Sequence, residues 1–272
     1  MADASELLSV YDAQLRARVP ERLPRGVTVD RDGPLLRFFG LDNRGFVGYR
    51  DLDGLDGARL DELIARQVRL FAERGEPFEW KLHEHDRPPD LARRLRLAGF
   101  VPEDEETVVI ASVDDVARRP LLPEGVSLRE VTQRNDLTRI AAFEQDAWGD
   151  GEDRSWLGES LGAERTADPQ GLVIVVAEAR RAIVCAGWAR FEHGTDFTTL
   201  WGGTTLPAWR GRGIYRAVVA YRASLARQRG FRFLEVDASS ASRPILERLG
   251  FSAVTTTTAY VWSPPAVAPT GP

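Results

Sequence analysis

The segment 206–215 has the residue types and spacing most suggestive of chemistry, in the order Leu-Pro-Ala-Trp-Arg-Gly-Arg-Gly-Ile-Tyr. A strand pattern precedes it, and an amphipathic helix pattern follows its second glycine. A helix start has unpaired backbone N–H groups and a positive dipole end. Gly211 and Gly213 would let several N–H groups converge on one anion. Arg210 and Arg212 add charge, so the pattern predicts a pyrophosphate cradle, although an isolated Arg-Gly-Arg-Gly is also common in basic surface loops.

The elements that would position this loop can be predicted from hydrophobic periodicity. In the second half we expect strands at 126–131, 172–179, 183–191, 197–205, 231–237 and 258–262, and helices at 136–148, 156–165, 214–229 and 242–249. In the first half we expect helices at 4–18, 59–74 and 89–98, and strands at 35–39, 45–49, 78–82 and 107–111. Strands and helices alternate, so the predicted fold class is α/β (α+β), with a mixed, mostly antiparallel sheet flanked by helices in each half.

The chain is expected to contain two successive domains and a tail. The stretch 114–125 contains Asp-Asp, Arg-Arg and prolines, which is typical of a linker. We therefore expect domains at 1–118 and 119–264, followed by a Pro-rich disordered tail at 265–272.

An internal repeat relates the two halves. Helix, Arg74-Gly75, strand, helix and Gly99-Phe100 are echoed by helix, Arg229-Gly230, strand, helix and Gly250-Phe251. Arg-Gly and Gly-Phe are also common helix endings, so the shared order and spacing, more than the dipeptides, favour a duplication.

The basic loop, Leu234-Glu235-Val236 and Leu249-Gly250-Phe251 together resemble the GNAT superfamily, the Gcn5-related N-acetyltransferases, over most of the second half. The two copies resemble GNAT proteins with tandem folds. The resemblance implies that acetyl-CoA is the co-substrate and that its pantetheine arm lies along Gly203, Thr204 and Thr205. It also implies a pyrophosphate site at Arg210, Gly211, Arg212, Gly213, Ile214 and Tyr215, with Ser239 or Ser240 near the start of the last helix.

The first copy is expected to be degenerate. It has Asp51-Leu-Asp-Gly-Leu-Asp-Gly57 where the basic loop should be, and acidic side chains there would repel a pyrophosphate. We predict that this copy does not bind CoA and serves as a scaffold or as a wall of the acceptor site.

Acyl transfer to an amine needs an unprotonated nucleophile, charge relief on the thioester oxygen and acceptance of the thiolate. Gly202-Gly203 suggests a strand bulge or relief of crowding near Trp201. By the resemblance, a bulge would aim the Gly203 N–H at the thioester. The family's usual glutamate and tyrosine are absent, since Thr198 or Thr199 and Leu246 stand there. The substitute bases are Asp237, which we favour, and Glu192, Asp196 or Glu235.

A segment rich in acidic and aromatic residues borders the acceptor pocket by the same resemblance. Carboxylates and indole faces suit a cationic amine. The residues are Asp146, Trp148, Asp150, Glu152, Asp153 and Trp156. The alternative interpretation is a polar loop between helices.

Composition narrows the other possibilities. The formal net charge is -5, which disfavours a general nucleic-acid binder. A single cysteine, Cys185, fits a reducing, cytoplasmic environment. We find no signal peptide and no membrane-spanning run. The stretch 83–86, His-Glu-His-Asp, resembles a set of metal ligands because alternate strand residues share a face, but no third histidine and no cysteine lies nearby, so we expect no metal.

The sequence therefore predicts a monomeric or homodimeric N-acetyltransferase that moves an acetyl group from acetyl-CoA to a primary amine of a small molecule or peptide. Two alternatives stay open. One is a non-catalytic acyl-CoA sensor or interaction module. The other is a tRNA-dependent aminoacyl transferase of GNAT fold, which the acidic balance disfavours.

Overall fold

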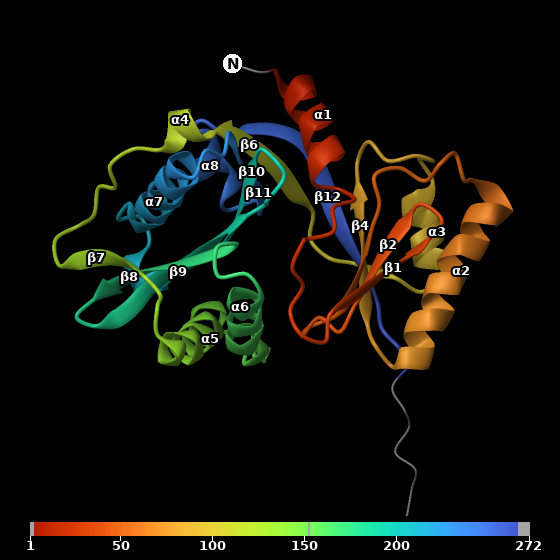
Figure 1. Ribbon diagram of the computed structural model, residues 1–272, viewed down its shortest axis with the longest axis horizontal. Coiled ribbons are helices and arrows are strands. Elements are labelled where there is room, and N and C mark those ends of the chain that lie inside the picture. The colour runs from red at the N-terminus through yellow and green to blue at the C-terminus, as the bar shows by residue number, and fades with distance from the viewer. Residues whose placement is uncertain (1–2, 152, 266–272) are drawn as a thin grey trace, which may run out of the picture. The chain divides into compact units, whose positions relative to one another are not determined.

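The computed structural model describes residues 3–151 and 153–265, and the chain divides into two compact units. Unit 1 is built mainly from Thr107–Val254, and unit 2 mainly from Gly26–Glu106. Val19–Arg25 belongs to unit 1, whereas Tyr11–Arg18 and the residues from Thr255 onward belong to unit 2. The helix α1 (Ala4–Gln14) opens the chain (Figure 1).

The strands of unit 1 are antiparallel to their neighbours except for one parallel pair, β10 and β11. Their order is β6 (Glu106–Ser112), β11 (Phe233–Ala238), β10 (Phe197–Thr205), β9 (Ala182–Phe191), β8 (Leu172–Ala179) and β7 (Val126–Glu130). The predicted mixed, mostly antiparallel arrangement is confirmed.

Helices cover both faces of these strands (Figure 1). The helices α5 (Arg134–Trp148) and α6 (Trp156–Ala167) pack on one face, and α7 (Ile214–Gln228) and α8 (Arg243–Glu247) on the other. The β8 side chains alternate between the two cores: Val173 and Val175 pack with α7, while Ile174 and Val176 pack with α5 and α6. Because both faces are covered, β8 is a continuous apolar run.

Unit 2 has the same plan on a smaller scale. Its strand order is β1 (Thr28–Asp32), β2 (Leu35–Phe39), β3 (Gly45–Gly48), β4 (Phe78–His83) and β12 (Ser252–Trp262), and β5 (Val101–Pro102) also pairs with β12. The helices are α2 (Gly57–Arg74) and α3 (Leu91–Leu97). The rings of Phe71 and Phe78 stack with centroids 4.0 Å apart and join α2 to β4.

The predicted repeat is present in the topology. In both units a helix connects two parallel strands, as β3–α2–β4 and as β10–α7–β11. The last strand of each repeat is exchanged: β6 pairs with β11, and β12 pairs with β4. The expected domain boundary between residues 118 and 119 therefore does not coincide with the boundaries of the compact units. The strands β6 and β12 belong to the units that contain their pairing partners, and these are not the neighbouring strands in the sequence. Residues 266–272 of the expected tail lie outside the described residues.

The expected linker 114–125 does not separate the units. It begins in the short helix α4 (Val113–Val116), whose two valines are buried in the core of unit 1. Within residues 3–151 and 153–265, no helix is both long and apolar enough to cross a membrane.

Candidate active site

The parallel pair β10–β11 separates partway along its length. Residue pairs are formed by 197–199 of β10 with 233–235 of β11, and the last is Thr199 with Glu235. Beyond this point β10 continues to Thr205 and pairs with β9 alone, while β11 continues to Ala238 and pairs with β6. The ends of the two strands nearest the basic loop are therefore not joined to each other.

A bulge interrupts β10 where the strands have separated. Gly202 pairs with Gly187 and Thr204 with Ala186, so Gly203 is the additional residue. The φ angles are +67° at Gly202 and +95° at Gly203, which favour glycine. The predicted bulge is present.

The alternative interpretation, in which the two glycines relieve crowding, is also correct in part. A Cβ on Gly202 would lie 2.6 Å from the Trp188 ring, and one on Gly203 would lie 2.4 Å from the Tyr215 ring. The neighbour of Gly202 is thus Trp188, whereas the sequence suggested Trp201. The two glycines allow both the bulge and close packing on either side of the strand.

Arg222 supports the bulge from the α7 side, and sequence reasoning missed it. Its guanidinium is buried, and Nη1 donates to the backbone oxygens of Trp188 (2.9 Å) and Trp201 (2.8 Å). These two residues form the pair next to the bulge. Burial lowers the pKa of Arg222. The available signal was its spacing from Val218, which places both on one face of α7.

The basic loop has the predicted strand–loop–helix setting. A 3₁₀ turn, Pro207–Trp209, leads to Gly211 and Gly213, whose φ angles are +74° and +81°. Gly213 is the N-cap of α7, so the first N–H groups of this helix have no intrahelical acceptor.

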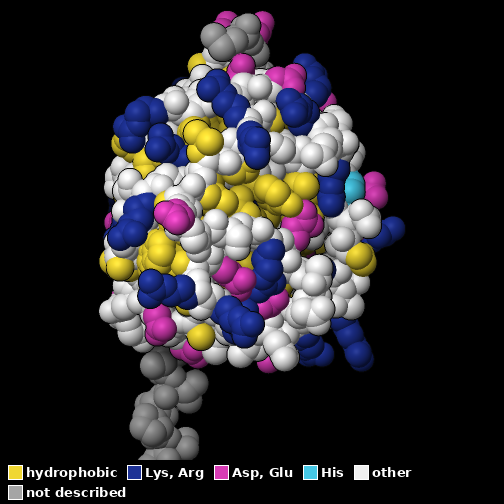
Figure 2. Space-filling view, turned by 90° about the vertical axis from the view of Figure 1, so that its left-hand side faces the viewer, with side chains coloured by type: hydrophobic (Ala, Val, Ile, Leu, Met, Phe, Trp, Pro, Cys, Tyr) yellow, Lys and Arg dark blue, Asp and Glu magenta, His cyan; other side chains and the backbone are white. Residues whose placement is uncertain are grey.

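The two arginines of the loop are exposed, and each makes a different contact. Arg210 Nε donates to the Thr205 backbone oxygen at 3.0 Å, which ties the loop to β10. The Arg212 guanidinium lies 4.9 Å from the centroid of the Trp209 ring. A further cation, Arg216, approaches the helix start: a Cβ on Gly213 would lie 3.4 Å from its Nη2. Figure 2 views the side formed by unit 1, where basic side chains are spread around apolar ones.

The favoured substitute bases lie in different places. Asp237 is half-buried in β11, two residues beyond the last β10–β11 pair, where its backbone pairs with Val108 of β6. Glu192 Oε1 accepts from the Thr199 hydroxyl at 3.1 Å. Thr199 lies four residues before Gly203, about 13 Å along an extended strand. Of the two, only Asp237 lies on the separated part of its strand.

The serines after β11 are joined to the start of α8. Ser239 O accepts from the N–H of Arg243 at 2.9 Å, and Ser239 Oγ lies 3.2 Å from Ser242 Oγ. Ser240 is exposed. Both serines therefore stand just past the separated end of β11.

The acidic and aromatic segment already contains a cation. Arg154 forms a bidentate pair with Asp150, at 2.6 and 2.7 Å, and its guanidinium lies 5.2 Å from the centroid of the Trp148 ring. Asp153 Oδ1 accepts from Ser155 N at 2.8 Å before α6. Asp146 is exposed and Trp156 partly buried, while Glu152 lies outside the described residues.

A buried carboxylate on α5, Glu144, also escaped sequence reasoning. The residue is 3% exposed, and its Oε2 accepts from Trp148 Nε1 at 3.1 Å. Burial raises the pKa of Glu144, against lowering effects from the side chains of Thr204 and Trp148. Its position beside Thr204 places it one residue from the bulge. A polar residue among the apolar positions of α5 was the available signal.

The corresponding part of unit 2 is occupied by its own side chains. The last β3–β4 pair is Val47 with Trp80. Asp86, beyond the end of β4, accepts from Tyr49 Oη at 2.5 Å and from Arg16 Nη2 at 2.6 Å. The Arg16 and Asp86 side chains are 2% and 4% exposed. At the start of α2, Asp56 occupies the N-cap position.

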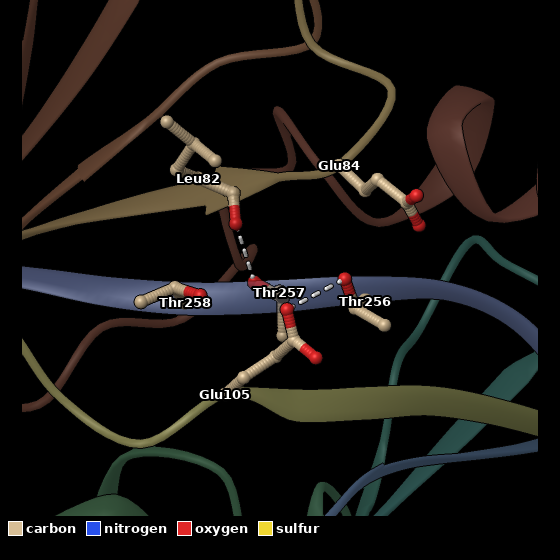
Figure 3. Close-up of a pocket in the computed structure, with 6 residues that line it drawn as sticks. All are labelled: Leu82, Glu84, Glu105, Thr256, Thr257 and Thr258. Atoms are coloured by element: carbon tan, nitrogen blue, oxygen red, sulfur yellow. Dashed lines mark hydrogen bonds between the residues drawn. The ribbon is translucent and has the colours of Figure 1, made fainter. Parts of the chain in front are cut away.

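Unit 2 also has a cavity of about 230 Å³ beside β12. Two carboxylates, from Glu84 and Glu105, and the hydroxyls of Thr256 and Thr257 line it (Figure 3). Thr256 Oγ1 donates to Glu105 Oε2 at 3.3 Å. Its acidic lining is unsuited to a pyrophosphate. Within the described ranges, no group of three or more His, Cys, Asp or Glu residues could hold a metal ion.

Comparison with known proteins agrees with this geometry. Residues 135–251 match the model of the acetyltransferase (GNAT) family. A GCN5-related N-acetyltransferase from Kribbella flavida is similar in structure, with a TM-score of 0.65, 18% identity, and coverage of 98% of this chain and 97% of that one. A tandem GNAT protein from the clavulanic acid biosynthesis pathway has a TM-score of 0.62 and 14% identity, with coverage of 96% and 97%.

A GCN5-related N-acetyltransferase from Sphaerobacter thermophilus has a TM-score of 0.59 and 18% identity, and the match covers 86% of this chain and 78% of that one. No curated protein matches in sequence. At these identities the structural matches establish the fold, and the family model establishes the family of the segment that contains the bulge and the basic loop. The chain has the tandem GNAT fold, and its residues 135–251 belong to the GNAT acetyltransferase family.

Proposed function

We propose that unit 1 transfers an acetyl group from acetyl-CoA to a primary amine of a small molecule or peptide. The observation that carries this proposal is the continuity of three features along one stretch of chain: the separated end of β10, its bulge at Gly203 and the glycine-capped start of α7. In acetyl-CoA an extended arm separates the thioester from the pyrophosphate. A site for this molecule would therefore need the bulge, for the thioester, and the helix start, for the pyrophosphate, in this order along the chain.

The pyrophosphate would be held at the start of α7. The amides from Gly211 to Tyr215 supply N–H donors, since the Arg210 amide already donates to the Pro207 oxygen at 3.3 Å, and the side chains of Arg210, Arg212 and Arg216 supply positive charge. The pantetheine arm would then follow Thr205 and Thr204 toward Gly203, with Ser239 and Ser240 near the end of β11. These roles rest on the position of each residue along the separated strands.

At the bulge the backbone N–H of Gly203 would donate to the thioester oxygen. Negative charge develops on that oxygen as the amine attacks, so a fixed donor there stabilises the transition state more than the ground state. Arg222 keeps this part of β10 in place through the Trp188 and Trp201 backbone oxygens. The carbon–sulfur bond then breaks, and a thiolate is a tolerable leaving group.

Unit 2 is proposed to bind no CoA. The buried Arg16–Asp86–Tyr49 group occupies the region beyond its last β3–β4 pair, and acidic side chains precede α2. Because the repeats exchange their last strands, the first half alone would lack β12, the partner of β4. CoA binding by this unit is therefore best tested in the whole chain.

Thiol release from acetyl-CoA across a panel of amines tests the proposal. We expect amine-dependent release by the wild type and a loss in Arg210→Ala/Arg212→Ala through a roughly 10- to 100-fold weaker CoA Kd. Arg180→Ala/Arg181→Ala, which removes two exposed charges from the β8–β9 turn, is the matched control. Tight CoA binding without thiol release from any amine would reject the enzyme and favour a sensor.

A further inference from the structure

Glu144 has an unmet hydrogen-bonding capacity in the interior of unit 1. Its Oε2 accepts from Trp148, whereas its buried Oε1 forms no hydrogen bond of ordinary length among the described residues, although the Thr204 side chain is close enough to lower the pKa of the carboxyl. A buried polar atom without a partner destabilises a fold, and a carboxylate does so more than a neutral group. Such a residue is consistent with a partner that arrives only when a ligand binds.

The positive charge that acts on this carboxylate is engaged by another residue. The charge of Arg154 lowers the pKa of Glu144, while both arms of its guanidinium are paired with Asp150. Trp148 contacts both residues: its indole N–H donates to Glu144, and its ring lies against the guanidinium of Arg154. The arrangement leaves Oε1 available for a second cation.

The position of Glu144 relative to the bulge indicates which cation would pair with its Oε1. Gly203 faces Tyr215 of α7, the helix whose start is proposed to hold the pyrophosphate. Thr204, the next residue, faces Glu144 of α5. Tyr215 and Glu144 thus lie on opposite faces of β10 near the bulge, and an amine that approaches the thioester from the α5 face would meet Glu144.

We propose that Glu144 binds the ammonium group of the acceptor and takes its proton, a step that rests on the proposed acetyl transfer. The R–NH₃⁺ group gives one proton to Oε1 and becomes R–NH₂. The nitrogen lone pair forms a bond to the thioester carbon, and the carbon–sulfur bond breaks with its electron pair leaving on sulfur. The second nitrogen proton passes to the CoA thiolate, and Glu144 returns its proton to water. The sum is R–NH₃⁺ plus acetyl-CoA giving the amide, CoA–SH and H⁺.

This assignment differs from the base favoured by the sequence. Asp237 belongs to β11, which pairs with β6, and Glu192 contacts Thr199 before the bulge. Glu144 belongs to the helix layer on the other side of β10. The three carboxylates therefore approach the bulge from different elements, and Glu→Gln or Asp→Asn changes can separate their roles.

The test uses Glu144→Gln, Asp237→Asn and a matched control, Glu159→Gln. Glu159 is exposed on the neighbouring helix α6, so its change is chemically the same outside the site. With an amine that the wild type acetylates, we expect Glu144→Gln to lose about 10²–10⁴-fold in kcat, the usual contribution of a general base, while the CoA Kd stays unchanged. Glu159→Gln should keep the wild-type kcat, and Asp237→Asn, at the base that the sequence favoured, should lose far less than Glu144→Gln.

The pH profile of kcat gives a second readout that a structural role would not move. A base acts only when ionised, so activity should fall as the pH drops through the raised pKa of Glu144. Thr204→Val and Trp148→Phe remove interactions that lower this pKa, so both should move the acidic limb to higher pH. The acceptor's own pKa is the same for every variant and cannot produce a difference between them.

The outcomes separate the two proposals. Wild-type kcat with an unmoved acidic limb in Glu144→Gln would overturn the role of Glu144 and leave acetyl transfer standing. If Glu144→Gln does not fold, unshifted limbs in both Thr204→Val and Trp148→Phe would overturn it instead. A wild type that binds CoA but acetylates no amine would overturn both proposals.

Discussion

The two repeats have the same strand–helix–strand plan but treat the space between their parallel strands in opposite ways. In unit 1 the strands separate after Thr199 and Glu235, and glycines form the bulge and the helix start. In unit 2 the strands separate after Val47 and Trp80, and a buried ion pair with a tyrosine lies beyond them. The difference teaches that the fold supplies the separation of the strands, while a few side chains decide whether a ligand can use it.

The largest effect is expected from breaking the buried ion pair of unit 2. Asp86→Asn would leave the Arg16 charge buried without its closest carboxylate, which should destabilise the protein by about 3–5 kcal/mol. Urea unfolding measures this. Asp90→Asn, at an exposed pair with Arg93 and Arg94, should have a much smaller effect because exposed ion pairs contribute little to stability. If Asp86→Asn were as mild as its control, the ion pair would not stabilise unit 2.

A comparable effect on activity is expected at the bulge of unit 1. Gly203→Val would place a branched side chain against Tyr215 at a φ of +95° and displace the backbone N–H. Because one oxyanion donor typically contributes about 10²–10³ in rate, kcat/KM should fall by that factor.

Gly194→Ala is the control for backbone strain. It has a φ of +78° in the β9–β10 turn, with open space around it, and it should retain activity. Equal losses in both variants, measured by steady-state kinetics, would remove the bulge from the mechanism.

The smallest effect concerns the stability of unit 1 and its dependence on pH. A carboxyl whose pKa is raised by folding gives its full stabilisation below its unfolded pKa and loses it as the pH rises through the folded pKa. Glu144→Gln lacks this loss, so its Tm should rise relative to the wild type as the pH increases above the ordinary carboxyl pKa. A difference of about 2–4 °C corresponds to ~1 kcal/mol. Parallel Tm curves would show that Glu144 is not buried in the way described.

Much of this arrangement could be predicted because it depends on local patterns. The strand 197–205 has the bounds expected from its apolar and glycine residues, and the loop that follows has the expected setting. The edge strand β1, with the sequence Thr-Val-Asp-Arg-Asp, was missed because its mostly polar, exposed residues show no core-facing alternation.

The features that could not be predicted depend on distant pairing. The exchange of β6 and β12 is a choice between equivalent strand partners, which hydrophobic periodicity does not distinguish. Glu144 and Arg222 gain their meaning from Thr204 and Trp188, which other strands bring to them. The side-chain contacts that define the site are therefore tertiary and cannot be read from the sequence. The glycines and arginines that indicate the site form a local sequence pattern and can be.

The central claim is that CoA binds to one of the two repeats and not to the other. Calorimetric titration of acetyl-CoA into the whole chain tests it most directly. The account predicts one site per chain, lost in Arg210→Ala/Arg212→Ala and kept in Arg180→Ala/Arg181→Ala. Absence of heat, or two sites per chain, would contradict it.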